Sequence, residues 1–322
     1  MKKLSIIVPC YNVEKYVART LESLLKQNCD LFTVLAIDDG STDSTLEILQ
    51  SYERKYPDTI QVYTKKNGGI AQTRNFGLSL VSTEYFGFLD SDDYIYDGML
   101  EKMLHKAETT QAELVVCNFE WVFETGNKEN YITKEGPYQP GKQMMLDLFA
   151  VLWNKIYRTD FVRKTGLKFP DGYRYEDASF LYRLVPHVSH VEFVDEPFVA
   201  YVQREGSITH THNEKVKDMV HVFDDLYQYY KENHYLELYK EELEYIFVRF
   251  FLGNSFLRSV QIKDKNDRLL TLELSWKTLD DHFPEWKRNK YVKMKGLKNL
   301  YYRLINRYNY MLFGKAFALI RR

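Results

Sequence analysis

Three carboxylate side chains, Asp90, Asp92 and Asp93, lie within four residues of one another at the end of an apolar run. The run, residues 86–89, is typical of a buried strand whose carboxyl end opens into a site. Carboxylates this close repel one another unless a cation neutralises them. A hard divalent ion, held by one or two carboxylates and by the phosphates of a nucleotide, is the usual physical solution. The alternative is a solvated acidic turn that merely follows a strand.

Two further polar clusters, residues 9–12 (Pro-Cys-Tyr-Asn) and residues 38–41 (Asp-Asp-Gly-Ser), also follow predicted strands. Tyr11 offers an aromatic face and Asp39 a carboxylate. This combination suits a nucleobase, because the base stacks on the ring while the carboxylate accepts the imide N–H of uracil. Taken alone, the second cluster is equally typical of a tight turn that leads into a helix cap.

A glycine turn, Asn67-Gly68-Gly69, runs into a predicted helix that carries Arg74 about one turn in. The backbone N–H groups of such a turn and the dipole of the helix favour a phosphate, and Arg74 is placed to reach the same anion. The turn is a weak signal by itself, because many loops share it. The chain lacks both the Walker pattern and the dinucleotide pattern Gly-x-Gly-x-x-Gly.

These clusters are separated by segments with the periodicities of strands and helices. The predicted strands are residues 4–9, 33–37, 60–64, 84–89 and 113–119, and the predicted helices are residues 13–27, from Ser41 or Asp43 to 56, 70–81 and 97–110. Strands that alternate with helices predict an open, doubly wound sheet with right-handed crossovers. Ligands of such sheets bind at the carboxyl ends of the strands, which is where the polar clusters fall.

The rest of the chain is organised differently. Residues 120–175 are mixed and rich in loops, and residues 191–202 are interpreted as two short strands separated by a proline turn. Helical patterns dominate from residue 213 onwards. We therefore predict an α/β domain over residues 1–212, a helical region over 213–285 and a separate segment over 286–322.

Composition limits the class of protein. With 45% hydrophobic and 28% charged residues in a chain of 322, a globular protein with a sizeable core is expected. The three cysteines form no metal-like spacing, and their odd number closes no disulfide framework, which favours a reducing, cytoplasmic setting. The N-terminal apolar run is too short for a signal peptide, and no run of 18 apolar residues occurs.

The last segment, residues 286–322, is strongly basic. It contains eleven Lys or Arg and no Asp or Glu, so subtracting 11 from the formal net charge of −1 leaves about −12 for residues 1–285. Apolar residues recur there at helical spacing: Leu297, Leu300, Tyr301, Leu304, Ile305, Tyr308, Met311 and Leu312. A basic amphipathic helix of this kind suits an anionic membrane surface. The alternatives are docking on the protein's own helices or a homo-oligomer contact. Nucleic acid is disfavoured, because the remainder of the chain is acidic.

Four motifs occur together and in order: residues 7–12 (Ile-Val-Pro-Cys-Tyr-Asn), 37–43 (Ile-Asp-Asp-Gly-Ser-Thr-Asp), 67–75 and 89–93 (Leu-Asp-Ser-Asp-Asp). As a set they resemble glycosyltransferase family 2, over roughly residues 1–210. The resemblance implies a GT-A fold, a Rossmann-like open sheet that is parallel or mixed, followed here by a helical region. It assigns nucleotide-sugar binding to Pro9, Tyr11, Asp39, Asn67, Gly68, Arg74, Asp90 and Ser91. It assigns a divalent metal, Mn²⁺ or Mg²⁺, to Asp92 together with Asp90, while Asp93 matches a trailing acidic position.

A second acidic pair, Glu176 and Asp177, precedes a helix-like stretch. From the residues alone, capping of that helix is the simpler role. The family resemblance implies instead that this pair supplies the catalytic base. Asp177 would remove the proton of the acceptor hydroxyl as its oxygen attacks the anomeric carbon. One direct displacement then predicts inversion at that carbon.

Two more segments resemble parts of the family. Trp153 and Lys155 match a segment on the acceptor side, with a packed aromatic as the alternative. Residues 203–210 match a loop near the nucleotide where some relatives supply a histidine metal ligand. Ser207 stands at that point here, so His210 or His212 is the candidate ligand.

The leading hypothesis is a metal-dependent, inverting glycosyltransferase with a UDP-sugar donor. Its acceptor would be a lipid-linked saccharide or another cell-envelope glycan, such as a capsule, reached at the inner face of the cell membrane. The Gln-x-x-Arg-Trp motif of processive synthases is missing, which favours addition of one sugar per encounter. The alternatives are a non-catalytic nucleotide-sugar-binding scaffold, and a transferase of a phosphorylated sugar or polyol.

Overall fold

The computed structural model describes residues 2–124, 128–204 and 212–320. The chain packs as two units. The first unit comprises residues 1–172 and 180–205, and the second comprises residues 173–179 and 206–322.

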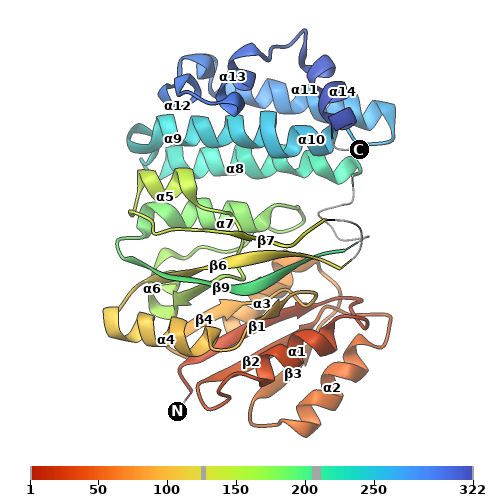
Figure 1. Ribbon diagram of the computed structural model, residues 1–322, viewed down its shortest axis with the longest axis vertical. Helices are drawn as coiled ribbons and strands as arrows, with labels where there is room; N and C mark the ends of the chain where they lie inside the picture. Colours follow the sequence, from red (N-terminus) through yellow and green to blue (C-terminus); the bar gives the residue numbers. More distant parts are fainter. Residues whose placement is uncertain (1, 125–127, 205–211, 321–322) are drawn as a thin grey trace. The chain divides into compact units, whose positions relative to one another are not determined.

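A nine-stranded sheet forms the centre of the first unit (Figure 1). Its strands are β1 (Leu4–Cys10), β2 (Phe32–Asp38), β3 (Ile60–Thr64), β4 (Tyr85–Phe88), β5 (Tyr94–Ile95), β6 (Leu114–Phe123), β7 (Tyr131–Thr133), β8 (Lys155–Arg158) and β9 (Val191–Gln203). Their order across the sheet is β3-β2-β1-β4-β8-β6-β9-β5, and β7 pairs with β6. Strands β3, β2, β1 and β4 are parallel neighbours, whereas β8 runs antiparallel to both β4 and β6. The predicted α/β fold with an open parallel or mixed sheet is therefore confirmed.

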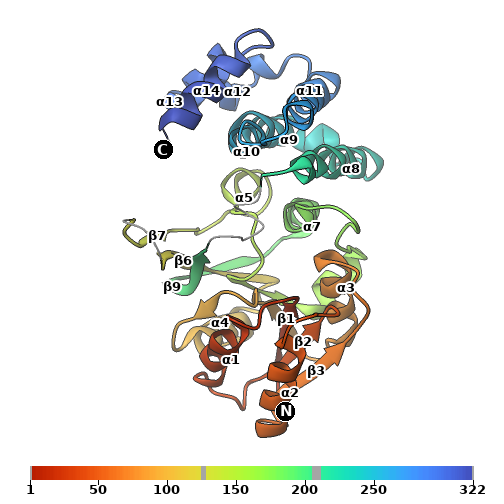
Figure 2. The same ribbon diagram turned by 90° about the vertical axis from the view of Figure 1, so that its right-hand side faces the viewer.

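Helices cover both faces of the parallel strands (Figure 2). The helices of this part of the chain are α1 (Val17–Leu25), α2 (Thr45–Lys55), α3 (Ile70–Leu80), α4 (Met99–Thr110), α5 (Lys142–Asp147), α6 (Thr159–Thr165) and α7 (Glu176–Leu184). Helix α1 buries Val17, Leu21 and Leu24, which recur at helical spacing, against the core.

Helix α3 approaches the opposite face of the sheet through Gly77. A Cβ atom at Gly77 would lie 2.5 Å from Cγ2 of Ile7 and 2.9 Å from Cδ1 of Ile37. Only glycine permits this close approach, so Gly77 sets the position of the helix that carries Arg74.

The segment expected to form two short strands forms one. Strand β9 is continuous from Val191 to Gln203 and pairs in parallel with β6. The register of the pair shifts on both sides of Asn118, which faces Pro197. Proline cannot donate to the ladder, so its effect is a local irregularity within the strand rather than its end.

The second unit is helical. Its helices are α8 (Asp218–Glu232), α9 (Leu236–Arg249), α10 (Ser255–Ser259), α11 (Lys265–His282), α12 (Lys290–Lys293), α13 (Leu297–Leu304) and α14 (Tyr310–Ile320). Phe223 of α8 and Phe247 of α9 meet edge to face at 5.0 Å, and Phe283 packs at 5.0 Å from Phe247. No helix in the described ranges combines the length and apolar content needed to cross a membrane.

The basic C-terminal segment does not form one amphipathic helix, so that prediction is wrong. Helices α13 and α14 are separated by residues 305–309. The Asn306 side chain there accepts hydrogen bonds from the backbone N–H groups of Tyr308 and Asn309, at 2.9 and 3.1 Å. This asparagine cap begins a new turn, and the extended backbone of Ile305 before it ends α13. Ile305, predicted to lie on the single apolar face of that helix, is fully buried.

Candidate active site

The three polar clusters follow strands that are parallel neighbours in the sheet. Strand β1 lies between β2 and β4, and all three run in the same direction. The backbone N–H of Asp39 donates to the carbonyl of Cys10 at 2.8 Å, and that of Leu89 donates to the carbonyl of Ile7 at 3.0 Å. The carboxyl ends of the strands therefore present their polar residues along one edge, as expected for a ligand site of an open α/β sheet.

Asp39 organises the glycine turn. Its side chain is 3% exposed, and its Oδ1 accepts from the backbone N–H of Gly68 at 3.0 Å and from Nζ of Lys65 at 2.5 Å. Its Oδ2 accepts from the backbone N–H of Gly69 at 2.8 Å. Two N–H groups that the sequence analysis assigned to a phosphate thus donate to Asp39 in this structure. The neighbouring Asp38 accepts from the backbone of Gly40 and Ser41, which is the tight-turn role.

Tyr11 presents its ring to solvent at the same edge, where it is 48% exposed. The turn that carries it is held by Asn12, whose Oδ1 accepts from the backbone N–H of Thr42 at 2.8 Å. An exposed aromatic ring on an anchored turn is suited to stacking on a planar ligand.

Two arginines pair with the acidic turn. Nη2 of Arg74 lies 2.9 Å from Oδ1 of Asp90, and Nη2 of Arg204 lies 2.7 Å from Oδ2 of Asp92. Burial raises the pKa of the Asp92 carboxyl above its usual value, and the charge of Asp90 raises it further, while Arg204 opposes both effects. The turn is therefore an anionic site whose charge is balanced by guanidinium groups.

Asp93 anchors the turn from within. It is 1% exposed, and its Oδ1 accepts from the backbone N–H of Val202 in β9 at 2.8 Å. The Thr20 hydroxyl of α1 donates to the carbonyl of Asp93 and lies 2.9 Å from the carbonyl of Ser91. Burial, followed by the charges of Asp92 and Asp90, raises the pKa of Asp93 well above its usual value. Asp93 therefore fixes the turn between α1 and β9.

The chemistry of this turn fits a divalent cation. Within residues 2–124, 128–204 and 212–320, no three His, Cys, Asp or Glu side chains converge as a complete metal site. Asp90 and Asp92 do supply two hard oxygen groups whose mutual charge a cation would relieve, and Mg²⁺-type sites often use one or two carboxylates together with substrate phosphates. His210, a candidate third ligand, lies outside the described residues.

Trp153 and Lys155, expected on the acceptor side, are enclosed in the core. Trp153 packs edge to face on Phe119 at 4.8 Å. The Lys155 ammonium donates to Oε1 of Glu135 at 3.0 Å and to Oδ1 of Asn154 at 2.8 Å. This is the packed arrangement that the sequence analysis left open, and contact of either side chain with an acceptor stays a prediction.

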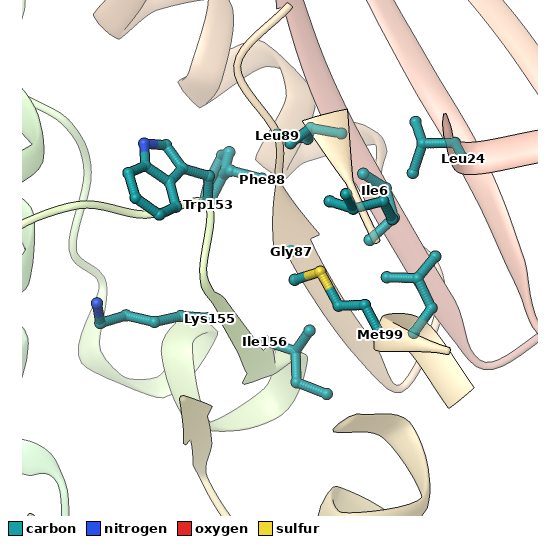
Figure 3. A pocket seen from close by; sticks show the side chains of 11 residues that line it. Ile6, Leu24, Gly87, Phe88, Leu89, Met99, Trp153, Lys155 and Ile156 are labelled. Atoms are coloured by element: carbon teal, nitrogen blue, oxygen red, sulfur yellow. The ribbon is translucent and has the colours of Figure 1, made fainter. Parts of the chain in front are cut away.

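A small cavity of about 10 Å³ lies beside Lys155, under the strand that leads to the acidic turn (Figure 3). It is lined mainly by apolar residues, among them Ile6, Leu24, Phe88, Leu89, Met99 and Ile156. The ammonium of Lys155 points away from these side chains (Figure 3). The cavity is too small and too apolar for a ligand and belongs to the core.

Glu176 and Asp177 form the first turn of α7, in the segment that packs with the second unit. The preceding Tyr175 has a φ of +70°, which is uncommon for a residue with a side chain. Nη1 of Arg258 donates to the Tyr175 hydroxyl at 3.1 Å, and the Tyr173 ring stacks on His221 at 5.2 Å. The helical unit thus holds the segment before Asp177, whose role as a base stays a prediction.

The partners of the acidic residues were not predicted from the sequence. Arg204 lies 112 positions from Asp92, and Lys65 lies 26 positions from Asp39. Spacing alone carries no signal for such pairs. The only available clue was that buried carboxylates require a partner cation.

Comparison with known proteins agrees with this geometry. Residues 5–174 match the family described as Glycosyl transferase family 2. The putative glycosyltransferase EpsH of Bacillus subtilis is 29% identical over 252 residues, which cover 75% of this chain and 73% of EpsH. The poly(ribitol-phosphate) β-N-acetylglucosaminyltransferase TarS of Staphylococcus aureus is 28% identical over 210 residues, which cover 64% of this chain and 36% of TarS.

Solved structures share the fold. A fragment of S. aureus TarS in complex with UDP-GlcNAc matches with a TM-score of 0.59 and 21% identity, over 94% of this chain and 78% of that one. The mannosyltransferase PcManGT from Pyrobaculum calidifontis, solved with GDP-Man and Mn²⁺, matches with a TM-score of 0.56 and 13% identity, over 98% of this chain and 80% of that one. The predicted GT-A fold is thereby confirmed. Because the family match covers more than half of the chain, this protein belongs to glycosyltransferase family 2 and is a glycosyltransferase enzyme.

Proposed function

We propose that this chain is a metal-dependent, inverting glycosyltransferase that moves a sugar from a UDP-sugar to a hydroxyl group of a lipid-linked or cell-envelope glycan. The observation that carries the proposal is the arrangement of Tyr11, Asp39, Arg74 and the acidic turn along one edge of β2, β1 and β4. The TarS fragment with bound UDP-GlcNAc supports UDP as the nucleotide, and the TarS name, which specifies poly(ribitol-phosphate), supports a polymer as acceptor.

The donor is bound from base to diphosphate along this edge. The uracil stacks on the exposed ring of Tyr11, and the buried carboxylate of Asp39 accepts its imide N–H. To do so, Asp39 exchanges one of its present donors, of which the flexible Lys65 ammonium is the easiest to release. Arg74, one turn into α3, then lies on the phosphate side of the site.

Asp90 and Asp92 would hold the divalent cation. Bound there, the ion would neutralise charge that develops on the departing diphosphate. The chain's own contribution is to keep both carboxylates at the end of β4. Asp93 and Thr20 do this by fixing the backbone of the turn.

Asp177 is the proposed general base, with Glu176 beside it. It takes the proton of the acceptor hydroxyl while that oxygen attacks the anomeric carbon opposite the diphosphate. The C–O bond to the acceptor forms as the C–O bond to the diphosphate breaks, so the configuration at the anomeric carbon inverts. The positive φ of Tyr175 and its contact with Arg258 support a fixed position for this segment.

Replacing Asp177 by Asn tests the proposal. The variant should bind UDP with the affinity of the wild type, measured by titration calorimetry with Mn²⁺. Its transfer rate from a panel of UDP-sugars should fall by roughly 10²–10⁴-fold, because the base is lost. The matched control is Asp160→Asn, which removes an acidic residue from the first turn of α6. Full transfer activity in Asp177→Asn would contradict the proposal that Asp177 is the general base.

We further propose that the enzyme works as a peripheral protein on the inner face of the cell membrane. Leu297, Leu300 and Leu304 share one face of α13 and are 87%, 43% and 53% exposed. The exposed large apolar residues of this segment continue with Met294, Tyr308 and Leu312. Exposed Lys and Arg surround them, and the segment carries no acidic residue. Apolar side chains among basic ones suit the boundary of an anionic bilayer.

Vesicle binding tests this surface. Each exposed leucine that enters the bilayer contributes about 1.5 kcal/mol, or roughly tenfold in affinity. Leu297→Ser with Leu304→Ser should therefore weaken binding to phosphatidylglycerol vesicles by about 100-fold. The control, Leu269→Ser with Leu270→Ser, changes two exposed leucines of α11 and should have no effect. Equal binding by both double variants would contradict the membrane proposal.

A further inference from the structure

Arg204 holds the carboxylate that the proposed metal site would use. The guanidinium group reaches Oδ2 of Asp92 through both Nη2, at 2.7 Å, and Nε, at 2.9 Å. The guanidinium group also lies over the ring of Tyr16, with its Cζ 4.3 Å from the ring centroid. The arginine is therefore held from two directions, by an ion pair and by a cation–π contact.

The other arginines near Asp92 do not pair with its carboxylate. Arg74 pairs with Asp90, and Arg19 donates to the backbone oxygen of Asp92 at 3.0 Å rather than to its carboxylate. Asp90 adds negative charge nearby. Arg204 thus supplies the positive charge that directly contacts the Asp92 carboxylate.

A divalent cation and this guanidinium cannot both occupy Asp92 Oδ2 without strong repulsion. A metal–oxygen bond is about 2.0–2.2 Å long, which would bring two positive groups into contact at one oxygen atom. A nucleotide diphosphate changes the balance. It offers the guanidinium fork two phosphate oxygens, and so a bidentate contact, in exchange for the carboxylate that the guanidinium gives up.

We propose that Arg204 is a placeholder for the metal, which releases Asp92 when the diphosphate of the donor arrives. This inference rests on the proposed metal-dependent function and adds a rule for how the two ligands bind. Arg204 keeps Asp92 neutralised and weakens metal binding in the absence of nucleotide. Since linkage is reciprocal, the diphosphate and the metal each strengthen the binding of the other. Arg204 acts on the metal through Asp92 and is a positioning residue.

The test measures Mn²⁺ affinity without nucleotide, by electron paramagnetic resonance of free Mn²⁺, and repeats the measurement with saturating UDP. Arg204→Gln should bind Mn²⁺ alone about tenfold more tightly than the wild type, within the roughly 5–150-fold range of allosteric coupling. The factor by which UDP tightens Mn²⁺ binding should shrink in the variant. In the Asp92→Asn background, Arg204→Gln should give no gain over Asp92→Asn alone, which locates the effect at this carboxylate.

Arg19→Gln is the matched control. It also deletes one positive charge beside the acidic turn but leaves the Asp92 carboxylate with its partner. Equal Mn²⁺ affinity in wild type and Arg204→Gln, or an equal gain in Arg19→Gln, would overturn the placeholder. If Arg204→Gln does not fold, Arg204→Lys replaces it, since lysine keeps the charge but loses the guanidinium fork. A smaller gain is then expected, and no gain would overturn the inference.

The same experiment separates the two proposals. If Mn²⁺ binding depends on UDP but is equal in the wild type, Arg204→Gln and Arg19→Gln, only the placeholder role of Arg204 is contradicted. No UDP-dependent Mn²⁺ binding in any protein would overturn the metal-dependent function and the inference together.

Discussion

Replacing Lys155 by Met would break an ion pair that is almost completely enclosed. The side chains of Lys155 and Glu135 are 0% and 2% exposed. The ammonium donates to Glu135, to Asn154 and to the backbone carbonyls of Phe149 and Val151, at 2.8–3.1 Å. Methionine has a similar length but no charge, so the substitution leaves the Glu135 carboxylate buried without its cation.

The expected loss of stability follows from that uncompensated charge. Removing one partner of a buried pair costs about 3–5 kcal/mol in the free energy of unfolding, while the near-equal volume keeps the cavity contribution small. At roughly 2–4 °C per kcal/mol for a unit of this size, Tm should fall by about 6–20 °C. Glu135→Gln added to Lys155→Met should recover part of the loss, because it removes the orphaned charge.

Thermal and urea unfolding of purified variants measure this effect. The control is Lys102→Met, which breaks an exposed pair whose side chains are 52% and 43% exposed, and which should cost less than about 1 kcal/mol. At temperatures where both variants remain folded, the KM for the acceptor should match the wild type. A Lys155→Met variant no less stable than Lys102→Met, but with a raised acceptor KM, would refute the structural role and favour direct acceptor contact.

Two further predictions concern the two carboxylate sites. Because the pKa of Asp93 is raised by folding, its contribution to stability is greatest below the usual carboxyl pKa and is lost as the pH rises through the folded-state value. Asp93→Asn should therefore gain Tm relative to the wild type as the pH rises above the usual carboxyl range in the presence of chelator, and parallel Tm curves would contradict this. Arg258→Ala should lower kcat by about tenfold with UDP affinity unchanged, because Tyr175 loses the contact that holds the segment before Asp177. An equal loss of UDP affinity, measured by calorimetry, would instead indicate a general structural defect.

The local sequence pattern was sufficient to predict most helices and strands of the α/β domain and part of the site. The helix predicted over residues 70–81 is α3, Ile70–Leu80, and the strand predicted over residues 60–64 is β3, Ile60–Thr64. Periodicity and glycine turns act over a few residues, so the chain itself carries these signals. The motifs also placed Asp39 and Asp90 at strand ends, because parallel strands share one carboxyl edge.

Long-range pairing was decided only by the tertiary structure. The proline turn at Pro197 suggested two strands, but ten paired positions along β6 keep β9 continuous. The apolar spacing from Leu297 to Leu312 suggested one helix. In the structure, two helices form on either side of the Asn306 cap, and Ile305 is buried in the core. Lys155, placed on the acceptor side by resemblance, lies in the core because Glu135, 20 residues earlier, is there to receive its charge. Arg204 reaches Asp92 across 112 residues. Residue types and spacing thus determine which groups are available for chemistry, whereas packing determines which of them meet, since burial and charge pairing depend on distances that the order of residues does not contain.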